Sequence, residues 1–278
     1  MISGSGWDEA VSEAEPIEVE APEILARDAD GPALILCEHA SNRIPQRYGG
    51  LGLARDAGES HAAWDPGARD VALGLARALN SPMVAARVSR LVYDCNRPPE
   101  AESAMPVRTE RIEVPGNRDL DIADRIERTE SVYTPFCAAV ESVINARCAA
   151  RRATALITVH SFTPTWFGKP RKTHIGILHD SDTRLADAML SRAHALPHRA
   201  IARNDPYGPQ DGVTHSLRLH GLAHDLPNVM IEIRNDLLAD AGDRARMVEE
   251  LLAMLRPALA ELDDTPRSAD SPGGDVHA

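Results

Sequence analysis

Short apolar runs that end in polar or ionisable residues recur along the chain. The first of these runs, Leu34–Cys37, lies between Gly31-Pro32 and a polar stretch that begins at Glu38. Apolar runs of about four to eight residues between turn residues are typical of strands covered on both faces, as in parallel α/β sheets. The pattern predicts further strands at Met83–Val88, Arg90–Arg97, Ala155–Ser161, His174–His179 and Asn228–Asn235.

Segments with apolar residues at helical spacing alternate with these strands. Helices are expected from Pro66 to about Leu79, over Ala123–Ala150 with a break near Pro135, over Asp182–Ala195 and over Ala239–Leu262. Strands that alternate with helices form a sheet with helices on both faces. The predicted fold is therefore a three-layer α/β/α sandwich with a mixed, mainly parallel sheet.

The two ends of the chain differ in composition from the part between them. Residues 1–25 are acidic and lack apolar periodicity, and residues 263–278 are rich in Pro, Ser, Gly and Asp. Such compositions favour disorder. We expect a disordered acidic leader at 1–25, a single domain at 26–262 and a disordered tail at 263–278. Within the domain, Pro98–Asp121 is expected to form a long functional loop.

Composition narrows the classes of function. The chain has 278 residues, 43% of them hydrophobic, with a formal charge of −12 and a pI near 5.4. An acidic chain is an unsuitable general partner for nucleic acid or an anionic membrane. No stretch approaches the ~20 apolar residues of a membrane span, and a secretory signal is not recognised. Four cysteines without close spacing indicate a reducing cytoplasm rather than a disulfide scaffold.

The predicted strand ends and one helix start bring candidate metal ligands together. His39 and His160 follow two strands, Asp65 precedes a helix and Glu232 interrupts an apolar strand. Two imidazoles and a carboxylate are a ligand set for a catalytic divalent metal, with zinc the expected ion. Asp65 also fits a helix N-cap, with Pro66 at the first helical position. His61, four residues earlier, is the alternate ligand.

Glu232 is the candidate general base. A glutamate between Met230-Ile231 and Ile233 would carry a large desolvation cost unless it were paired or functional. Pairing with Arg234 or Arg90 is the structural alternative. Glu38, which faces away from His39 if the strand is regular, is interpreted as a structural acid.

Cationic and amide side chains near the same strand ends are candidates for binding the substrate. Guanidinium groups suit a substrate carboxylate and a polarised carbonyl, and salt bridges to Asp94, Asp236 or Glu232 are the alternative interpretation. The candidates for substrate binding are Arg90, Asn96 and Arg97, with Ser161 from the loop after His160, and Arg234 is assigned to catalysis beside Glu232.

Six motifs in the same order along the chain resemble the N-formylglutamate amidohydrolase family. They cover about residues 33–255 and comprise Cys37–Asn42, His61–Ala68, Ser89–Arg97, His160–Pro164, Asp211–Thr214 and Glu232–Asp236. The resemblance implies a fold similar to zinc-dependent exopeptidases and hydrolysis of an N-formyl or related N-acyl amino acid. It leaves the acyl group, the side-chain preference and the oligomeric state open.

Comparison with zinc carboxypeptidases bears on the third ligand. Those enzymes place a glutamate ligand three residues after their first histidine, where this chain has Asn42. The third ligand is therefore expected from Asp65, or from His61, and Asn42 is assigned to the substrate. Two other classes remain: a binding or sensor protein that keeps the pocket without the chemistry, and a metal-independent serine hydrolase using Ser41 or Ser161, which no G-x-S-x-G motif supports.

Overall fold

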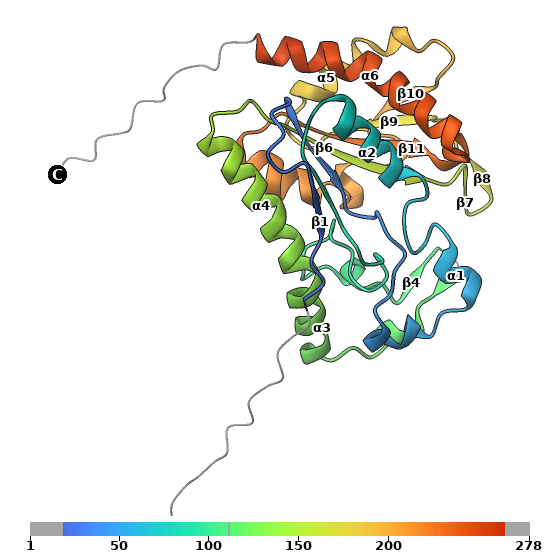
Figure 1. Ribbon diagram of the computed structural model, residues 1–278. Coiled ribbons are helices and arrows are strands. Elements are labelled where there is room, and N and C mark those ends of the chain that lie inside the picture. Colours follow the sequence, from blue (N-terminus) through green and yellow to red (C-terminus); the bar gives the residue numbers. More distant parts are fainter. Residues whose placement is uncertain (1–18, 111, 265–278) are drawn as a thin grey trace, which may run out of the picture.

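A seven-stranded sheet forms the centre of the computed structural model, which describes residues 19–110 and 112–264 (Figure 1). Most of the expected leader and nearly all of the expected tail lie outside the described residues. The strands across the sheet are, in spatial order, β1 (Glu23–Leu25), β3 (Met83–Ala85), β2 (Ala33–Cys37), β6 (Ala155–Phe162), β11 (Asn228–Arg234), β9 (Ile175–Leu178) and β10 (Ile201–Arg203).

The sheet is mixed and mainly parallel, as predicted. Strands β3, β2, β6 and β11 run parallel to one another, so their carboxyl ends meet at one edge of the sheet. β1 is antiparallel to β3, and β9 is antiparallel to β11 with β10 parallel to it. The end of β9 therefore lies at the opposite edge from the ends of β6 and β11.

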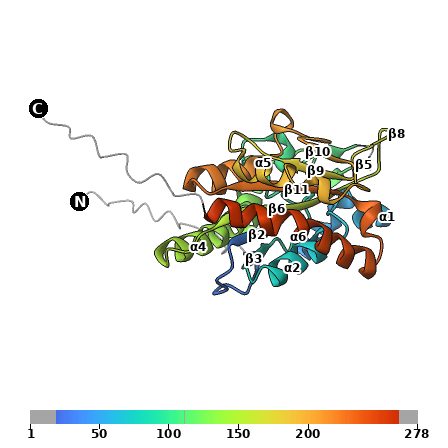
Figure 2. The same ribbon diagram turned by 90° about the horizontal axis from the view of Figure 1, so that it is seen from above.

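Helices cover both faces of the sheet, which confirms the three-layer sandwich. α2 (Ala68–Ala78), α5 (Arg184–Leu190) and α6 (Ala241–Asp263) pack on one face, and α4 (Thr134–Ala149) packs on the other (Figures 1 and 2). The strands alternate between the two cores because successive side chains point to opposite faces. Ile35 of β2 lies in the core under α2 and α6, and its neighbours Leu34 and Leu36 lie in the core under α4.

The remaining elements are short. α1 (Arg55–Glu59) follows β2, and α3 (Ile122–Arg128) leads into α4 through a π-helical turn at Thr129–Tyr133. The expected break near Pro135 is thus displaced to the turn before it. Two hairpins project beside the sheet, formed by β4 (Arg108–Thr109) with β5 (Ile112–Glu113) and by β7 (Thr165–Trp166) with β8 (Lys169–Pro170).

Two local expectations were wrong. Arg90–Arg97 is a series of turns rather than a strand, because side chains take over the hydrogen bonds that a neighbouring strand would make. Ser89 Oγ accepts from the amide of Leu91, and the carboxylate of Asp94 accepts from the amide of Asn96. Glu23–Leu25, assigned to the leader, forms the edge strand β1.

Candidate active site

A row of three polar side chains crosses the centre of the sheet at its carboxyl edge. The register of β6 and β11 places His160 beside Glu232. The parallel register of β2 and β6 pairs Leu36 with Thr158, and two residues further on this register places Glu38 opposite His160. Because side chains alternate between faces, all three point to the face that packs under α4. The pleat and register of the strands therefore assemble this part of the site.

His39 and Asp65 reach the row from turns. His39 follows β2, and its carbonyl oxygen accepts from the amide of Asp65 at 3.0 Å, which joins the two turns. The predicted N-cap at Asp65 is not found, since α2 starts at Ala68 and Gly67, with φ 81°, takes the cap position. The Asp65 carboxylate is instead turned into the site, where its Oδ2 accepts from the amide of Ser161 at 3.3 Å.

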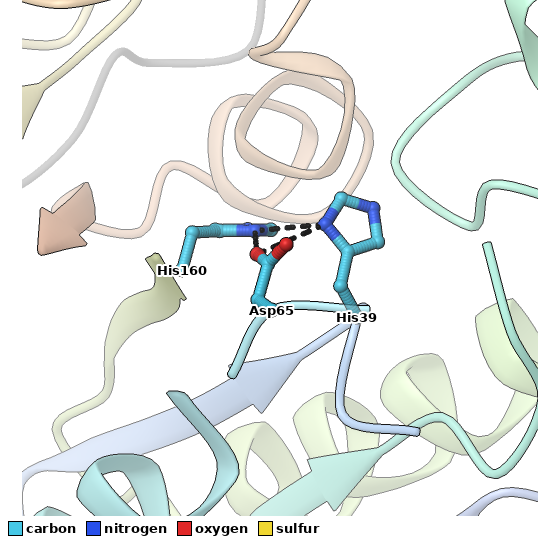
Figure 3. A group of neighbouring side chains, drawn as sticks. All are labelled: His39, Asp65 and His160. Carbon is cyan, nitrogen blue, oxygen red and sulfur yellow. Dashed lines mark hydrogen bonds and ion pairs between the residues drawn. The ribbon is translucent and has the colours of Figure 1, made fainter. Parts of the chain in front are cut away.

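Three ligand atoms converge at the centre of the site (Figure 3). His39 Nδ1 and His160 Nδ1 are 3.1 Å apart, and they lie 3.2 Å and 3.0 Å from Asp65 Oδ2. All three residues are buried, with at most 3% of each exposed. The predicted set of two imidazoles and one carboxylate is thus brought to a single point.

The far nitrogen of each imidazole faces another carboxylate. His39 Nε2 lies 2.7 Å from Asp94 Oδ1, and His160 Nε2 lies 3.3 Å from Glu38 Oε2, an ion-pair contact that is not aligned as a hydrogen bond. A carboxylate only accepts, so a neutral imidazole carries its proton on Nε2 and its lone pair on Nδ1. Two lone pairs and a carboxylate oxygen then face one another, an arrangement that a cation or a proton between them stabilises.

These residues fit a divalent metal. Ligand atoms about 2.0–2.1 Å from a tetrahedral zinc ion are roughly 3.3 Å apart, close to the separations found here. Carboxylates that orient the ligating imidazoles are the usual surroundings of such sites. Burial lowers the pKa of His160, but the charges of Glu38 and Asp65 outweigh it and hold that pKa well above its usual value. The site is therefore built to accept positive charge.

Arg90 fixes the positions of two of the carboxylates. Its Nη1 donates to Asp65 Oδ1 at 3.2 Å and its Nη2 donates to Asp94 Oδ2 at 3.1 Å. The planar guanidinium thus holds a metal-ligand candidate and the partner of His39 at a set separation. These contacts agree with the alternative interpretation, in which Arg90 forms salt bridges with nearby carboxylates.

Glu232 lies beside the three ligand atoms without an ion pair among the described residues. It is 6% exposed, and its Oε2 has no hydrogen-bond partner in the described part of the chain. Burial, with the charge of Asp65, raises the pKa of Glu232 to about 7, against the opposing effect of the imidazoles. A carboxyl group with a pKa near neutrality can both accept and return a proton.

A cavity of about 500 Å³ opens onto these groups. Asn96, Arg97 and Ser161 also line it, as do Trp166, Arg171 and Tyr207. The Asn96 side chain is committed at both ends, since it donates to the carbonyl of Val213 and accepts from the amide of Ser216. Ser161 Oγ donates to the carbonyl of Pro66 rather than to an imidazole.

Three predicted residues lie outside the described lining of the cavity. The Asn42 side chain donates to the carbonyl of Gly58, and the guanidinium of Arg234 pairs with Asp236. His61 is 3.4 Å from Glu110 and does not join the three ligand atoms. Between the two alternatives for the third ligand, the geometry favours Asp65.

Two residues of the site, Asp94 and Glu38, were not predicted from the sequence to support the metal ligands. Asp94 was considered only as a salt-bridge partner, and Glu38 only as a structural acid facing away from His39. Glu38 and His39 do point to opposite sides of the chain. However, the neighbouring strand β6 presents His160 on the same face of the sheet as Glu38. Identifying Glu38 requires the order of strands in the sheet, which a single sequence does not reveal.

Asp94→Asn should weaken metal binding while leaving the fold intact. The amide cannot hold the proton of His39 Nε2 as a carboxylate does, and loss of such a partner usually costs about 10–100-fold in metal affinity. Titration with zinc against a competing chelator measures the effect. Asp182→Asn is the matched control, because Asp182 is a similarly buried carboxylate that pairs with Arg184. Equal affinities in the two variants would contradict the role of Asp94.

Comparison with known proteins supplies the family context. The family model described as N-formylglutamate amidohydrolase matches residues 31–239. The crystal structure of a gene product from Agrobacterium tumefaciens is 51% identical with a TM-score of 0.86, and the match covers 88% of this chain and 97% of that one. N-formylglutamate amidohydrolase from Ralstonia eutropha JMP134 is 18% identical with a TM-score of 0.66, over 89% and 100% of the two chains, and shares the fold.

No curated protein matches the chain. Within the ranges that the structure describes, every helix is too short or too polar to span a membrane.

Proposed function

Because the chain belongs to the N-formylglutamate amidohydrolase family, we propose that it hydrolyses N-formylglutamate or a similar N-acyl amino acid with the help of a divalent metal, zinc by preference. His39, Asp65 and His160 would hold the ion. The products are the free amino acid and formate, or another acid if the acyl group differs. The name of the Ralstonia eutropha protein, N-formylglutamate amidohydrolase, agrees with this substrate class.

One observation carries the proposal: three candidate ligand atoms lie 3.0–3.2 Å from one another, beside a buried carboxylate that has no hydrogen-bond partner among the described residues. Ligand atoms held this close suit a shared cation, and a buried carboxylate without a partner suits a role in proton transfer. Both features fit metal-assisted attack of water on an amide. The cavity above the site gives the substrate access.

The residues divide the chemistry between them. When bound, a divalent metal supplies a Lewis acid that polarises the acyl carbonyl and makes water more acidic. Glu232 accepts the proton of the attacking water, the oxygen of that water bonds to the acyl carbon, and the C–N bond breaks as the proton passes to the departing amine. Arg97 would place positive charge on the cavity wall for the substrate carboxylate and the developing oxyanion, while Arg90 holds the carboxylates of Asp65 and Asp94 in position.

The two other classes find less support. A binding or sensor protein needs neither the three converging acceptors nor an unpartnered Glu232. For a serine hydrolase, Ser161 Oγ donates to the carbonyl of Pro66 and Ser41 Oγ accepts from the amide of Arg43, and neither contacts an imidazole among the described residues.

Formate release from N-formylglutamate tests the proposal. Zinc-loaded protein should release formate, exhaustive chelation should abolish the release, and added zinc should restore it. Full activity after metal removal would favour the serine hydrolase. Zinc binding without turnover of any N-formyl amino acid would favour the sensor.

A further inference from the structure

Four arginines line the active-site cavity, and they differ in how their charge is compensated. Arg90 is paired with Asp65 and Asp94, and the exposed Arg108 is 3.5 Å from Glu113. The other two, Arg97 and Arg171, contact no carboxylate among the described residues. In a chain of net charge −12, two guanidinium groups that line one cavity without contacting a carboxylate of the described residues point to an anionic ligand.

Arg171 is held in place without being neutralised. Its guanidinium carbon lies 4.8 Å from the ring centre of Tyr207, 5.0 Å from that of Trp166 and 5.3 Å from that of Phe162. Aromatic faces attract a guanidinium and fix its plane, and they also shield it from water. The backbone is fixed as well, because Arg234 Nη1 donates to the carbonyl of Arg171 at 3.1 Å. Arg234 thus supports the segment that carries Arg171.

Within the described part of the chain, most of the hydrogen-bonding capacity of the Arg171 guanidinium is unused. A guanidinium has five N–H groups, and those of Arg171 serve Tyr207 Oη at 2.9 Å and, at 3.5 Å, the carbonyl of Thr163. Since Tyr207 Oη accepts from Arg171, its own proton is available to a ligand. Arg171 and Tyr207 together therefore present a cationic fork and a neutral donor, the partners that suit a carboxylate.

Tyr207 connects this pair to the reacting centre. Burial and the charge of Glu232 raise the pKa of Tyr207, and the charges of Arg171 and Arg90 act against them. The phenol is thus within electrostatic range of Glu232 on one side and bonded to Arg171 on the other. A ligand group at Arg171 would lie in the same cavity as the scissile amide.

We infer, on the basis of the proposed function, that Arg171 with Tyr207 binds the side-chain carboxylate of an acidic N-acyl amino acid and determines specificity for it. The α-carboxylate is attached to the carbon that bears the scissile nitrogen, so it lies nearer to the metal ligands. Arg97 is suited to it, being three residues from Asp94, the partner of His39. Arg171 then binds the more distant side-chain carboxylate. As a result, N-acylglutamate is preferred over its neutral isostere N-acylglutamine.

The test compares N-formylglutamate with N-formylglutamine, whose side chains have the same shape but end in a carboxylate and a neutral carboxamide respectively. Wild-type protein should favour the acid in kcat/KM by roughly 10²-fold, since loss of one partner of a desolvated charge pair has an effect of that order. Arg171→Met should remove this preference, chiefly through KM, while keeping a long side chain between the aromatic rings. Arg171→Lys should restore part of it, and Tyr207→Phe should lose about tenfold on the acid alone.

Control variants and substrates separate specificity from structure. Arg108→Met, which changes an arginine of the same cavity that is paired with Glu113, should keep the wild-type preference. If Arg171→Met lowers turnover of both substrates equally, Arg171 only supports the hairpin or serves the α-carboxylate, and the inference is overturned. A wild-type protein without preference overturns it too.

Failure of the proposed function gives a different result. If neither compound releases formate, the proposed function fails, and calorimetric binding of the same two compounds to zinc-loaded wild-type and Arg171→Met protein decides the inference. Selective binding of N-formylglutamate that the substitution removes would uphold the carboxylate site. Equal binding of both compounds by the wild type would overturn it.

Discussion

His160→Ala is expected to remove both the bound metal and the hydrolytic activity. His160 Nδ1 is one of the three converging ligand atoms, and the substitution leaves only His39 and Asp65. Several kcal/mol of transition-state stabilisation depend on the ion, and each 1.36 kcal/mol is worth a factor of ten, so kcat/KM should fall by roughly 10³-fold or more. Elemental analysis of the purified variant, beside formate release, measures both effects.

The control for this variant is His179→Ala. His179 is also buried at the end of a strand, but β9 runs antiparallel to β11, so this histidine lies at the opposite edge of the sheet. Its variant should retain metal and most of the activity. If His160→Ala kept a full equivalent of metal, the assignment of the ligands would be wrong, provided that circular dichroism shows the native fold.

Glu232→Gln is expected to reduce turnover and leave the metal in place. The substitution keeps the size of the side chain and removes the group that takes the proton from water, and loss of such a group typically costs about 10²–10⁴-fold in kcat. KM should change little, because Glu232 acts on the transition state rather than on substrate binding. Steady-state kinetics with metal analysis on the same preparation provide the measurement.

Glu250→Gln controls for loss of a buried glutamate. Glu250 is 8% exposed and pairs with Arg199 and His198, so its variant should keep the wild-type kcat. A Glu232→Gln protein that lost its metal would identify Glu232 as a ligand and leave the general base unassigned. A variant with wild-type kcat would exclude Glu232 from proton transfer.

The parts of the fold that were predicted correctly are those in which a local pattern and the tertiary structure agree. β2, β6 and β11 are buried on both faces, so their apolar runs are visible in the sequence without knowledge of their neighbours. The polar residues that end these runs had to lie at one edge once the strands were parallel. This reasoning placed His39, His160 and Glu232 together.

The failures have the opposite cause, since tertiary contacts overrode the local signal there. Asp65, the predicted third ligand, also fitted an N-cap, and only its contacts with His39, His160 and Arg90 from distant segments exclude the capping alternative. The apolar run near Val92 resembles a strand but forms turns, because neighbouring polar side chains accept hydrogen bonds from the backbone amides. Arg171 lies outside the apolar runs and the helical patterns, so no periodicity in the sequence indicated a role for it.

The row Glu38, His160 and Glu232 makes one half of the site as rigid as the sheet itself. These residues sit on or directly after three adjacent strands, whereas His39, Asp65 and Asp94 sit on turns. Central strands open only at a free energy near that of global unfolding, and turns open at much lower cost. One side of the site is therefore held by the sheet and the other by turns that Arg90 links, and we expect the turns to move more readily than the strands.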